Sequence, residues 1–267
     1  MSKASFAPGK MILSGEYAVV FGYPGIAVPT TFGVEVTWKD TGDAPMKIVL
    51  GGLTGDEWYR QKILDLCIQI STGVRPAPPT TGTLTIHNQI PVGRGMGSST
   101  ALVIAICKCL LGKENRTQAV LVEDTINPGN SGLDFSVIWI NRPVKFTKGS
   151  TPEPLHLNLD FLKNSTLIDT GKPGETTADL VAWIKTRAEE PETAAALKTI
   201  GRCTERLIAG DDIKTVMRDH HQAQMKLGVV TPEAVKIIAD IERKGGAAKV
   251  LGAGARTGGG GMVLALQ

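Results

Sequence analysis

The residues best suited to phosphate chemistry lie in a glycine-rich segment near the middle of the first half. From Pro91 to Thr100 the chain reads Pro-Val-Gly-Arg-Gly-Met-Gly-Ser-Ser-Thr, with three glycines at a spacing of two before the hydroxyls. Glycines let the backbone approach a ligand closely and aim successive N–H groups at one anion. A helix starting here would add its N-terminal dipole. The segment predicts phosphate binding, with a glycine-rich connection that binds nothing as the alternative.

Two known phosphate motifs do not fit this segment. No lysine precedes its hydroxyls, as a P-loop would require. Its glycine spacing also differs from the dinucleotide fingerprint, and no βαβ unit is evident around it. The segment is therefore a different kind of phosphate cradle.

Two further glycine-rich loops make a ligand-free connection a poorer explanation. The chain opens with Ala7-Pro-Gly-Lys, in which Lys10 stands alone between a glycine and an apolar run. Near the C-terminus, Lys249 to Gly261 forms another glycine-rich loop between an expected helix and an expected strand, which is the third of these loops in chain order.

Elements on either side must position these loops. Apolar and β-branched runs predict strands, and 3.6-residue periodicity predicts helices. We expect strands at 11–13, 18–21, 33–38, 83–90, 165–169 and 262–266, and a strand, a turn and a second strand within 135–148. We expect helices at 57–70, 100–111 and 193–207. Two further helices are expected from their end signals, one capped by Thr177 and stopped by Pro191, and one started by Thr231 and Pro232. Strands followed by helices in both halves predict an α+β fold, with two lobes that meet near residue 150.

Composition excludes several other classes of protein. The 267 residues are 42% hydrophobic, 21% charged and 5% aromatic with a net charge of +3, which argues against disorder, a nucleic-acid surface or a polybasic membrane anchor. The N-terminus has no signal-peptide pattern, and the longest apolar stretch, 101–111, is too short to cross a bilayer. We therefore expect a soluble cytoplasmic protein.

The four cysteines show neither CxxC pairs nor zinc-ligand spacing. Cys107 and Cys109 lie in an apolar run, so we expect buried free thiols there. His220 and His221 fall in a polar helical pattern without a partner at ligand spacing, and we expect them at the surface.

In this order and spacing, the three loops resemble the motifs of the GHMP kinase superfamily. The first is Pro8-Gly9-Lys10, the second runs from Pro91 to Ala101 with Met96 where leucine is usual, and the third is Gly252 to Gly261. The resemblance implies a two-lobed GHMP kinase fold with the active site in the cleft between the lobes. Residues 1–150 would form a nucleotide-binding lobe of mixed sheet and helices, and 151–267 a ferredoxin-like α/β lobe.

Within the superfamily the chain is most similar to the mevalonate kinases. The stretch from Lys10 to Pro29 is similar to their first motif, and Glu123 to Asp134 resembles their segment before the catalytic aspartate, with a different Gly/Asn/Pro order. Tyr17 stands where histidine is usual, and Ala255-Arg256-Thr257 is an insertion in the third loop. These departures concern the choice of substrate.

The resemblance implies ATP and Mg²⁺ as cofactors and assigns roles to individual residues. Asp134 would be the base, with Lys10 beside it, and Glu123 with Ser99 would ligate Mg²⁺, Asp124 being the rival of Glu123. The ATP-binding residues would be Pro91, Gly93, Arg94, Gly95, Met96, Gly97, Ser98, Ser99 and Thr100. The substrate-binding residues would be Lys10, Glu16, Tyr17, Asp134, Gly252, Ala253 and Arg256.

Some of these residues have plainer alternatives. Glu123 would otherwise be a solvated helix residue, Tyr17 purely structural, and Arg256 an outward-pointing side chain rather than one that contacts the phosphoryl group or the substrate carboxylate. Trp58 is a candidate for the adenine pocket, with a core position as the alternative.

The implied activity is ATP-dependent phosphorylation of the primary hydroxyl of (R)-mevalonate to 5-phosphomevalonate, in isoprenoid synthesis. The alternatives are a phosphomevalonate kinase, whose acceptor would need cations beyond Lys10 and Arg94, and a non-catalytic ligand-sensing protein of the same fold. The implied partner is a small molecule, without nucleic acid or membrane, and a homodimer is the family's expectation.

Overall fold

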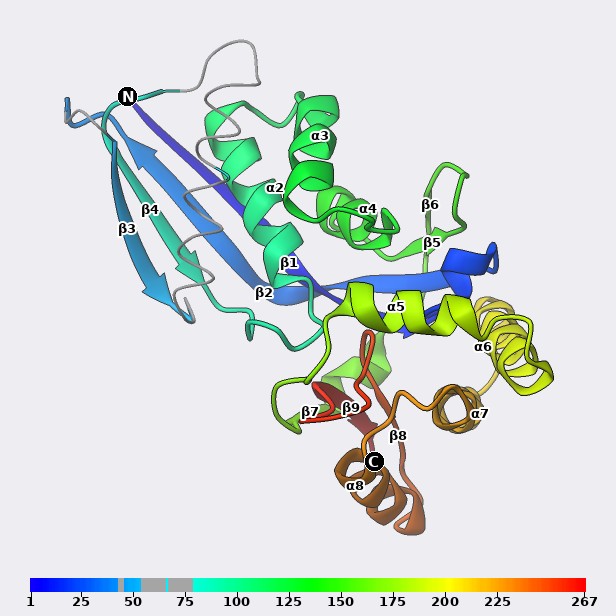
Figure 1. Cartoon of the computed structure of the whole chain (residues 1–267). Coiled ribbons are helices and arrows are strands. Elements are labelled where there is room, and N and C mark those ends of the chain that lie inside the picture. The colour runs from blue at the N-terminus through cyan, green and yellow to red at the C-terminus, as the bar shows by residue number, and fades with distance from the viewer. Residues whose placement is uncertain (43–45, 54–65, 67–78) are drawn as a thin grey trace. The chain divides into compact units, whose positions relative to one another are not determined.

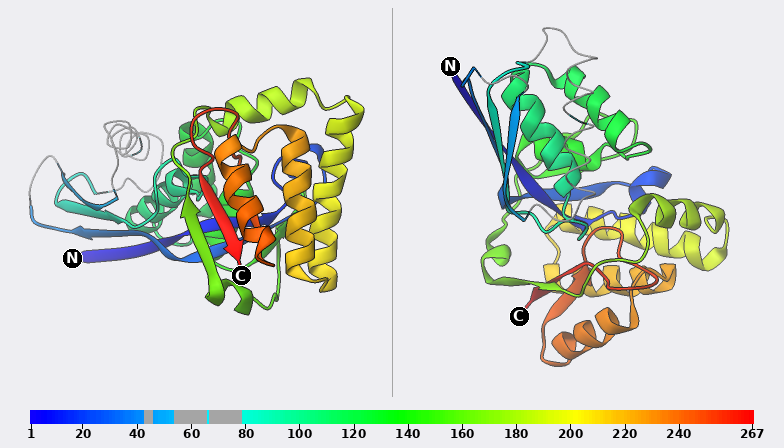
Figure 2. Two further views of the ribbon diagram at one scale, coloured as in Figure 1. Left: turned by 90° about the horizontal axis from the view of Figure 1, so that it is seen from below. Right: turned by 60° about the vertical axis from the view of Figure 1, so that its left-hand side comes forward.

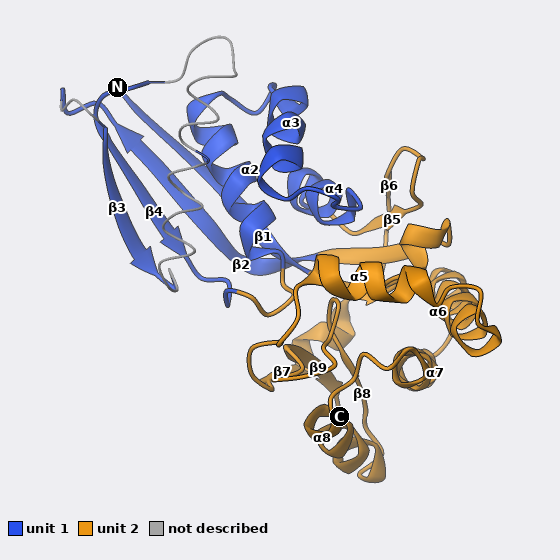
Figure 3. Ribbon diagram, in the orientation of Figure 1, with its two compact units in different colours: residues 1–10, 29–92, 97–141 blue, residues 11–28, 93–96, 142–267 orange. Residues whose placement is uncertain are grey.

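The computed structural model describes residues 1–42, 46–53, 66 and 79–267 (Figure 1). The chain forms two compact units (Figure 3), unit 1 from Met1–Lys10, Pro29–Val92 and Gly97–Asn141, and unit 2 from Met11–Val28, Gly93–Met96 and Arg142–Gln267. Both units are discontinuous in sequence, because β1 (Ser2–Ser14) and β2 (Gly25–Lys39) each contribute to both. The functional division into lobes 1–150 and 151–267 stays a prediction.

In the residues that the structure describes, unit 1 combines strands with three helices. Strand β4 (Thr83–Asn88) pairs in parallel with β3 (Lys47–Gly52) and antiparallel with β2, while β1 pairs with β2. The helices are α2 (Ser98–Leu110), α3 (Arg116–Ile126) and α4 (Leu133–Ile140). All three lie on the same side of these strands (Figures 1 and 2).

Helix α2 is fixed to β1 along its length. Its nearly continuous apolar sequence is buried from Ala101 to Cys107, and each fully buried Leu, Ile or Val side chain contributes roughly 1.5–3 kcal/mol. The hydroxyl of Ser5 donates to the carbonyl of Ala105 at 2.6 Å, and Lys3 donates to the carbonyl of Leu110 at 3.1 Å. The start of α2, which follows the second glycine-rich loop, is therefore held against the strand that carries Lys10.

Two of the expected strands are helical. Residues 133–140 form α4, and Ala18–Phe21 form the 3₁₀ helix η1, so both predictions were wrong. A short run that is apolar on every side carries no period that separates a buried helix from a buried strand. The second strand expected within 135–148 is present as β5 (Val144–Phe146).

Unit 2 is built on a three-stranded antiparallel sheet in the order β7 (Ser165–Asp169), β9 (Met262–Leu266), β8 (Ala247–Val250). Helices α7 (Ile213–Leu227) and α8 (Pro232–Arg243) pack against β8, and α6 (Pro191–Ala209) packs against α7. The unit also contains η1, β5, β6 (Glu153–Pro154), η2 (Asp160–Asn164) and α5 (Thr177–Thr186).

Local signals explain where these helices begin. Thr176 caps α5 in a capping box with Asp179, one residue before the expected position, and Pro191 starts α6 rather than stopping α5. Thr231 caps α8 and Pro232 is its first residue, as expected.

The remaining sequence predictions have mixed outcomes. Cys107 and Cys109 are buried free thiols, which confirms that prediction. The helix expected at 57–70, Cys67 and Trp58 lie outside the described residues. Across the ranges that the structure does describe, we find no helix with both the length and the apolar character needed to cross a membrane.

Candidate active site

Lys10 and Asp134 form an ion pair within unit 1. Lys10 lies on β1 and Asp134 in the first turn of α4, and the distance from Nζ to Oδ1 is 3.1 Å. The lysine side chain is 4% exposed and the aspartate 35%, so the amine is buried while the carboxylate keeps access to solvent. The expectation that these two residues lie side by side is confirmed.

Gly97 brings the start of α2 against this pair. Its φ of 75° lies in the left-handed region, and a Cβ there would come within 3.0 Å of the Lys10 side chain. No side chain caps α2 through a hydrogen bond at this position. The N–H groups of the first turn thus begin next to a buried cation, which is an arrangement suited to an anion.

Four polar side chains form a connected group behind the first turn of α2. The Thr100 hydroxyl donates to Oε1 of Glu123 at 2.7 Å, and the Ser99 hydroxyl donates to Oδ1 of Asn127 at 2.8 Å. Asn127 in turn donates to Oε2 of Glu123 at 3.0 Å. Glu123 is 2% exposed, so the plainer alternative of a solvated helix residue is wrong. Asp124 is exposed and accepts a hydrogen bond from Asn130.

This group, Ser99, Thr100, Glu123 and Asn127, fits a magnesium ion chemically. It offers hydroxyl, amide and carboxylate oxygens, and Mg²⁺ is typically bound by one or two carboxylates together with substrate phosphates and water. In the part of the chain that the structure describes, no three His, Cys, Asp or Glu residues gather as a metal site. A magnesium site with a single carboxylate would therefore need the phosphates of a nucleotide as further ligands of the ion.

Asn127 was missed by the sequence reasoning. It follows Glu123 by four residues, which is about one helical turn, and stands at the C-cap of α3, from where its side chain reaches Glu123. This four-residue spacing was the one signal in the sequence that could have indicated that Asn127 lies beside Glu123. An asparagine beside Pro128 and Gly129 reads more readily as a turn residue.

Tyr17 and the third glycine-rich loop meet within unit 2. The Tyr17 hydroxyl donates to the carbonyl of Ala253, and the side chain is buried. Burial, reinforced by the charges of Glu16 and Glu175, raises the pKa of Tyr17, so the phenol stays protonated. Its φ of 63° is unusual for a residue other than glycine.

The second and third glycine-rich loops touch through their backbones in unit 2. A Cβ on Gly252, whose φ is 68°, would come within 3.0 Å of the Cα and carbonyl oxygen of Gly95. Arg94 pairs with Asp169, with Nε and Oδ1 2.7 Å apart. Met96 is buried, whereas Gly93 is exposed and Pro91 half-buried.

The inserted residues of the third loop are held by neighbours in unit 2. Ala255 is buried and donates to the carbonyl of Val229, while Arg256 is exposed. The Arg256 guanidinium lies over the Trp183 ring, 4.2 Å from its centroid, and its backbone N–H donates to Glu175 at 3.0 Å. A role of Arg256 toward phosphate or substrate stays a prediction.

Glu16 does not lie on an open pocket wall but is 2% exposed and ion-paired to Lys249, and Nε2 of His220 lies 3.0 Å from its other carboxylate oxygen. The expectation that His220 and His221 are at the surface was wrong, because both are buried. The helical pattern around them is polar, but α7 packs against both α6 and β8, and this packing buries both side chains.

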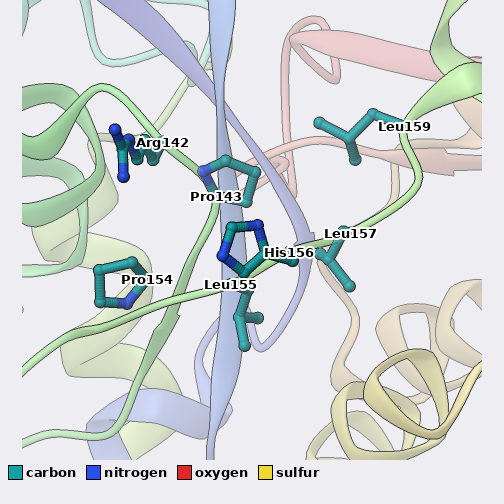
Figure 4. Close-up of a pocket in the computed structure, with 7 residues that line it drawn as sticks. All are labelled: Arg142, Pro143, Pro154, Leu155, His156, Leu157 and Leu159. Carbon is teal, nitrogen blue, oxygen red and sulfur yellow. The ribbon is translucent and has the colours of Figure 1, made fainter.

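A separate pocket in unit 2 has a volume of about 420 Å³ (Figure 4). It is lined by Arg142, Pro143, Pro154, Leu155, His156, Leu157 and Leu159. None of these residues belongs to the three glycine-rich loops, so the pocket is not part of the candidate site.

Comparison with known proteins agrees with the chemistry of these residues. Residues 57–123 match the family model for the GHMP kinases N terminal domain. The chain is 30% identical to the mevalonate kinase of Thermococcus gammatolerans, in an alignment that covers 97% of this chain and 87% of that protein. The chain belongs to the mevalonate kinase family.

Solved structures of the family share this fold. The mevalonate kinase of Methanococcus jannaschii superposes with a TM-score of 0.81 at 23% identity, covering 100% of this chain and 90% of that one. The mevalonate kinase of L. major, solved in complex with R-mevalonate, gives a TM-score of 0.78 at 17% identity and covers 99% and 86%. The α+β GHMP kinase fold expected from the sequence is confirmed.

Proposed function

We propose that this member of the mevalonate kinase family transfers the γ-phosphoryl group of ATP to the primary hydroxyl of (R)-mevalonate, giving 5-phosphomevalonate. The observation that carries the proposal is the Lys10–Asp134 ion pair beside Gly97 and the first turn of α2. A kinase of this type needs one base, a nearby cation and a phosphate cradle, because phosphoryl transfer depends mainly on positioning and charge stabilisation.

In this mechanism Asp134 takes the proton from the mevalonate hydroxyl as it attacks phosphorus. Lys10 forms an ion pair with this carboxylate and lies where charge develops on the attacking oxygen. The partial exposure of Asp134 lets a substrate reach it, while burial of the lysine strengthens its field.

The phosphates of ATP would be held by the segment Pro91, Gly93, Arg94, Gly95, Met96, Gly97, Ser98, Ser99 and Thr100. The backbone N–H groups of its glycines and of the first turn of α2 are the donors. Glu123 and Ser99 would hold Mg²⁺, with Thr100 and Asn127 orienting the glutamate. When bound, the ion neutralises charge on the phosphate oxygens.

Mevalonate would be bound by Lys10, Asp134, Tyr17, Gly252, Ala253 and Arg256, whereas Glu16 is too deeply buried to contact it directly. Arg94 is the other cation of the first two motifs. Its guanidinium is already paired with Asp169, so it is not available to bind an acceptor phosphate. This favours mevalonate over phosphomevalonate as acceptor. The cytoplasm and a homodimer belong to the same proposal, and light scattering of the purified protein tests the dimer.

The test is an ADP-release assay with mevalonate, phosphomevalonate and homoserine as acceptors, at saturating ATP and Mg²⁺. We expect kcat/KM for mevalonate to exceed the other two by at least about 10²-fold. Higher turnover of phosphomevalonate would replace the proposed activity by its alternative. No turnover of any acceptor would support a non-catalytic protein.

A further inference from the structure

The last residues of the third glycine-rich loop are paired with the segment that follows β7, and both belong to unit 2. The N–H of Gly261 donates to the carbonyl of Gly171 at 3.0 Å, and the N–H of Gly259 donates to the carbonyl of Lys172 at 2.8 Å. A Cβ on Gly259 would lie 2.3 Å from the carbonyl carbon of Gly171, so the two backbones touch. This pairing fixes the end of the loop that enters β9.

The inserted residues that precede this paired part are held by one carboxylate. Oε2 of Glu175 accepts from the backbone N–H of Arg256 at 3.0 Å and from that of Thr257 at 3.3 Å. Oε1 of the same carboxylate accepts from the Thr257 hydroxyl at 2.9 Å. Glu175 directly precedes Thr176, the cap of α5. The carboxylate therefore ties the insertion to the start of α5 through both of its oxygens.

The negative charge of Glu175 strengthens these hydrogen bonds. Burial acts to raise the pKa of Glu175, but the hydrogen bonds from the two inserted residues outweigh it and lower that pKa. An ionised carboxylate is a stronger acceptor than a neutral group. After burial and the charge of Glu16, the charge of Glu175 also helps to raise the pKa of Tyr17. Glu175 therefore lies near the side chain whose hydroxyl donates to the carbonyl of Ala253.

The Arg256 side chain makes a second, weaker contact between the insertion and α5. Its guanidinium lies over the ring of Trp183, and the guanidinium of Arg187, at the C-cap of α5, lies over the same ring at 4.6 Å from the centroid. Cation–π contacts of exposed side chains are weak. Hydrogen bonds to a charged acceptor are stronger and fix the backbone itself. Glu175 is therefore the main link between the insertion and α5.

We propose that Glu175 is a positioning residue for substrate binding, which holds the insertion 255–257 against the start of α5 and so fixes the adjoining residues Gly252 and Ala253. The proposal rests on the proposed function, because that function assigns Gly252, Ala253 and Arg256 to mevalonate. Glu175 itself does not touch substrate in this scheme.

The test compares three variants of the full chain. Glu175→Ala removes both acceptor oxygens, and Glu175→Gln keeps a carbonyl oxygen for the two backbone N–H groups but loses the charge. Asp179→Ala is the matched control. Asp179 completes the capping box of α5 with Thr176, so its loss weakens the same helix start without removing an acceptor from the insertion. Each variant is measured for mevalonate KM, ATP KM and kcat, and for hydrogen exchange of peptides covering 252–261.

We expect Glu175→Ala to raise mevalonate KM about tenfold or more, because hydrogen bonds to a charged acceptor are lost. ATP KM should stay within about twofold of the unmodified enzyme, since the proposed donors to ATP lie in the segment 91–100. Exchange at 252–261 becomes faster in Glu175→Ala. Glu175→Gln restores mevalonate KM to within about threefold, because its amide oxygen still accepts from the two N–H groups. Asp179→Ala leaves mevalonate KM and exchange at 252–261 unchanged.

Equal effects of Glu175→Ala and Asp179→Ala would overturn the proposal, since a merely structural role at the start of α5 predicts them. So would unchanged exchange at 252–261 in Glu175→Ala, or a Glu175→Gln variant as impaired as Glu175→Ala. Failure of the proposed function is seen separately, as absence of mevalonate turnover in the unmodified enzyme. In that case exchange at 252–261 still decides whether Glu175 positions the loop.

Discussion

The buried ring of His221 predicts a defined loss of stability in acid. Its side chain is 2% exposed, and burial, followed by the neighbouring His220 and Lys249, lowers its pKa from the ordinary 6.5 to about 4. Between pH 7 and pH 5 the unfolded chain takes up a proton at this position and the folded chain does not. Stability from this group is thus complete above about pH 6.5 and is lost as the pH falls toward 4.

At pH 5 this loss amounts to about 2 kcal/mol relative to pH 7. His220 acts in the same direction, because its pKa is also lowered. Glu16, whose pKa falls from 4.5 to about 2, loses its contribution only at lower pH, so pH 5 separates the histidines from the carboxylate.

The measurement is thermal unfolding of the unmodified protein and of His221→Leu at pH 7 and pH 5. For a chain of 267 residues, about 2 kcal/mol corresponds to about 4 °C in Tm. The decrease in Tm between the two pH values should be smaller by that amount in His221→Leu. His156→Gln, at an exposed histidine, should show the full decrease. An equal decrease in His221→Leu and the unmodified protein would refute the reasoning.

Four further variants test the candidate site through kinetics. Asp134→Asn keeps the shape of the side chain but removes the base, so kcat should fall roughly 10²–10⁴-fold with ATP KM little changed; near-normal turnover would exclude Asp134 as the base. Glu123→Gln should raise the Mg²⁺ concentration for half-maximal rate by at least about tenfold, whereas Asp124→Asn, at an exposed neighbour, should not; the reverse result would identify Asp124 as the ligand. Arg256→Ala should lower kcat or raise mevalonate KM, and a variant with both values unchanged would leave Arg256 as a surface partner of Trp183.

The sequence predicts the parts of the site that depend on local signals. Glycine spacing before the hydroxyls predicts the start of α2, which follows the left-handed Gly97. The motif resemblance predicts that Lys10 and Asp134 lie side by side, and the structure confirms this with Nζ and Oδ1 3.1 Å apart. Thr231 and Pro232 start α8 as their cap chemistry requires.

Prediction from the sequence fails for residues whose burial depends on how distant elements pack in the tertiary structure. His220 and His221 look like surface residues because the sequence around them is polar, but packing of α7 against α6 and β8 buries both. Lys249 becomes one of the most buried side chains because Glu16, 233 residues earlier, supplies its counter-charge. Pairings of this kind have no local signature. The strand prediction for the α4 segment is wrong for a related reason, because an all-apolar run has no periodicity that separates a helix from a strand.

The most direct test of the central claim is ³¹P and ¹H NMR of the product formed from ATP and (R)-mevalonate. The unmodified enzyme should give a new phosphomonoester coupled to the C5 methylene protons, with one ADP formed per product. Asp134→Asn should bind ATP but form this product at least about 100-fold more slowly. Formation of ADP without the C5 phosphomonoester, or equal rates in the two proteins, would contradict phosphoryl transfer to the mevalonate primary hydroxyl by the Lys10–Asp134 pair.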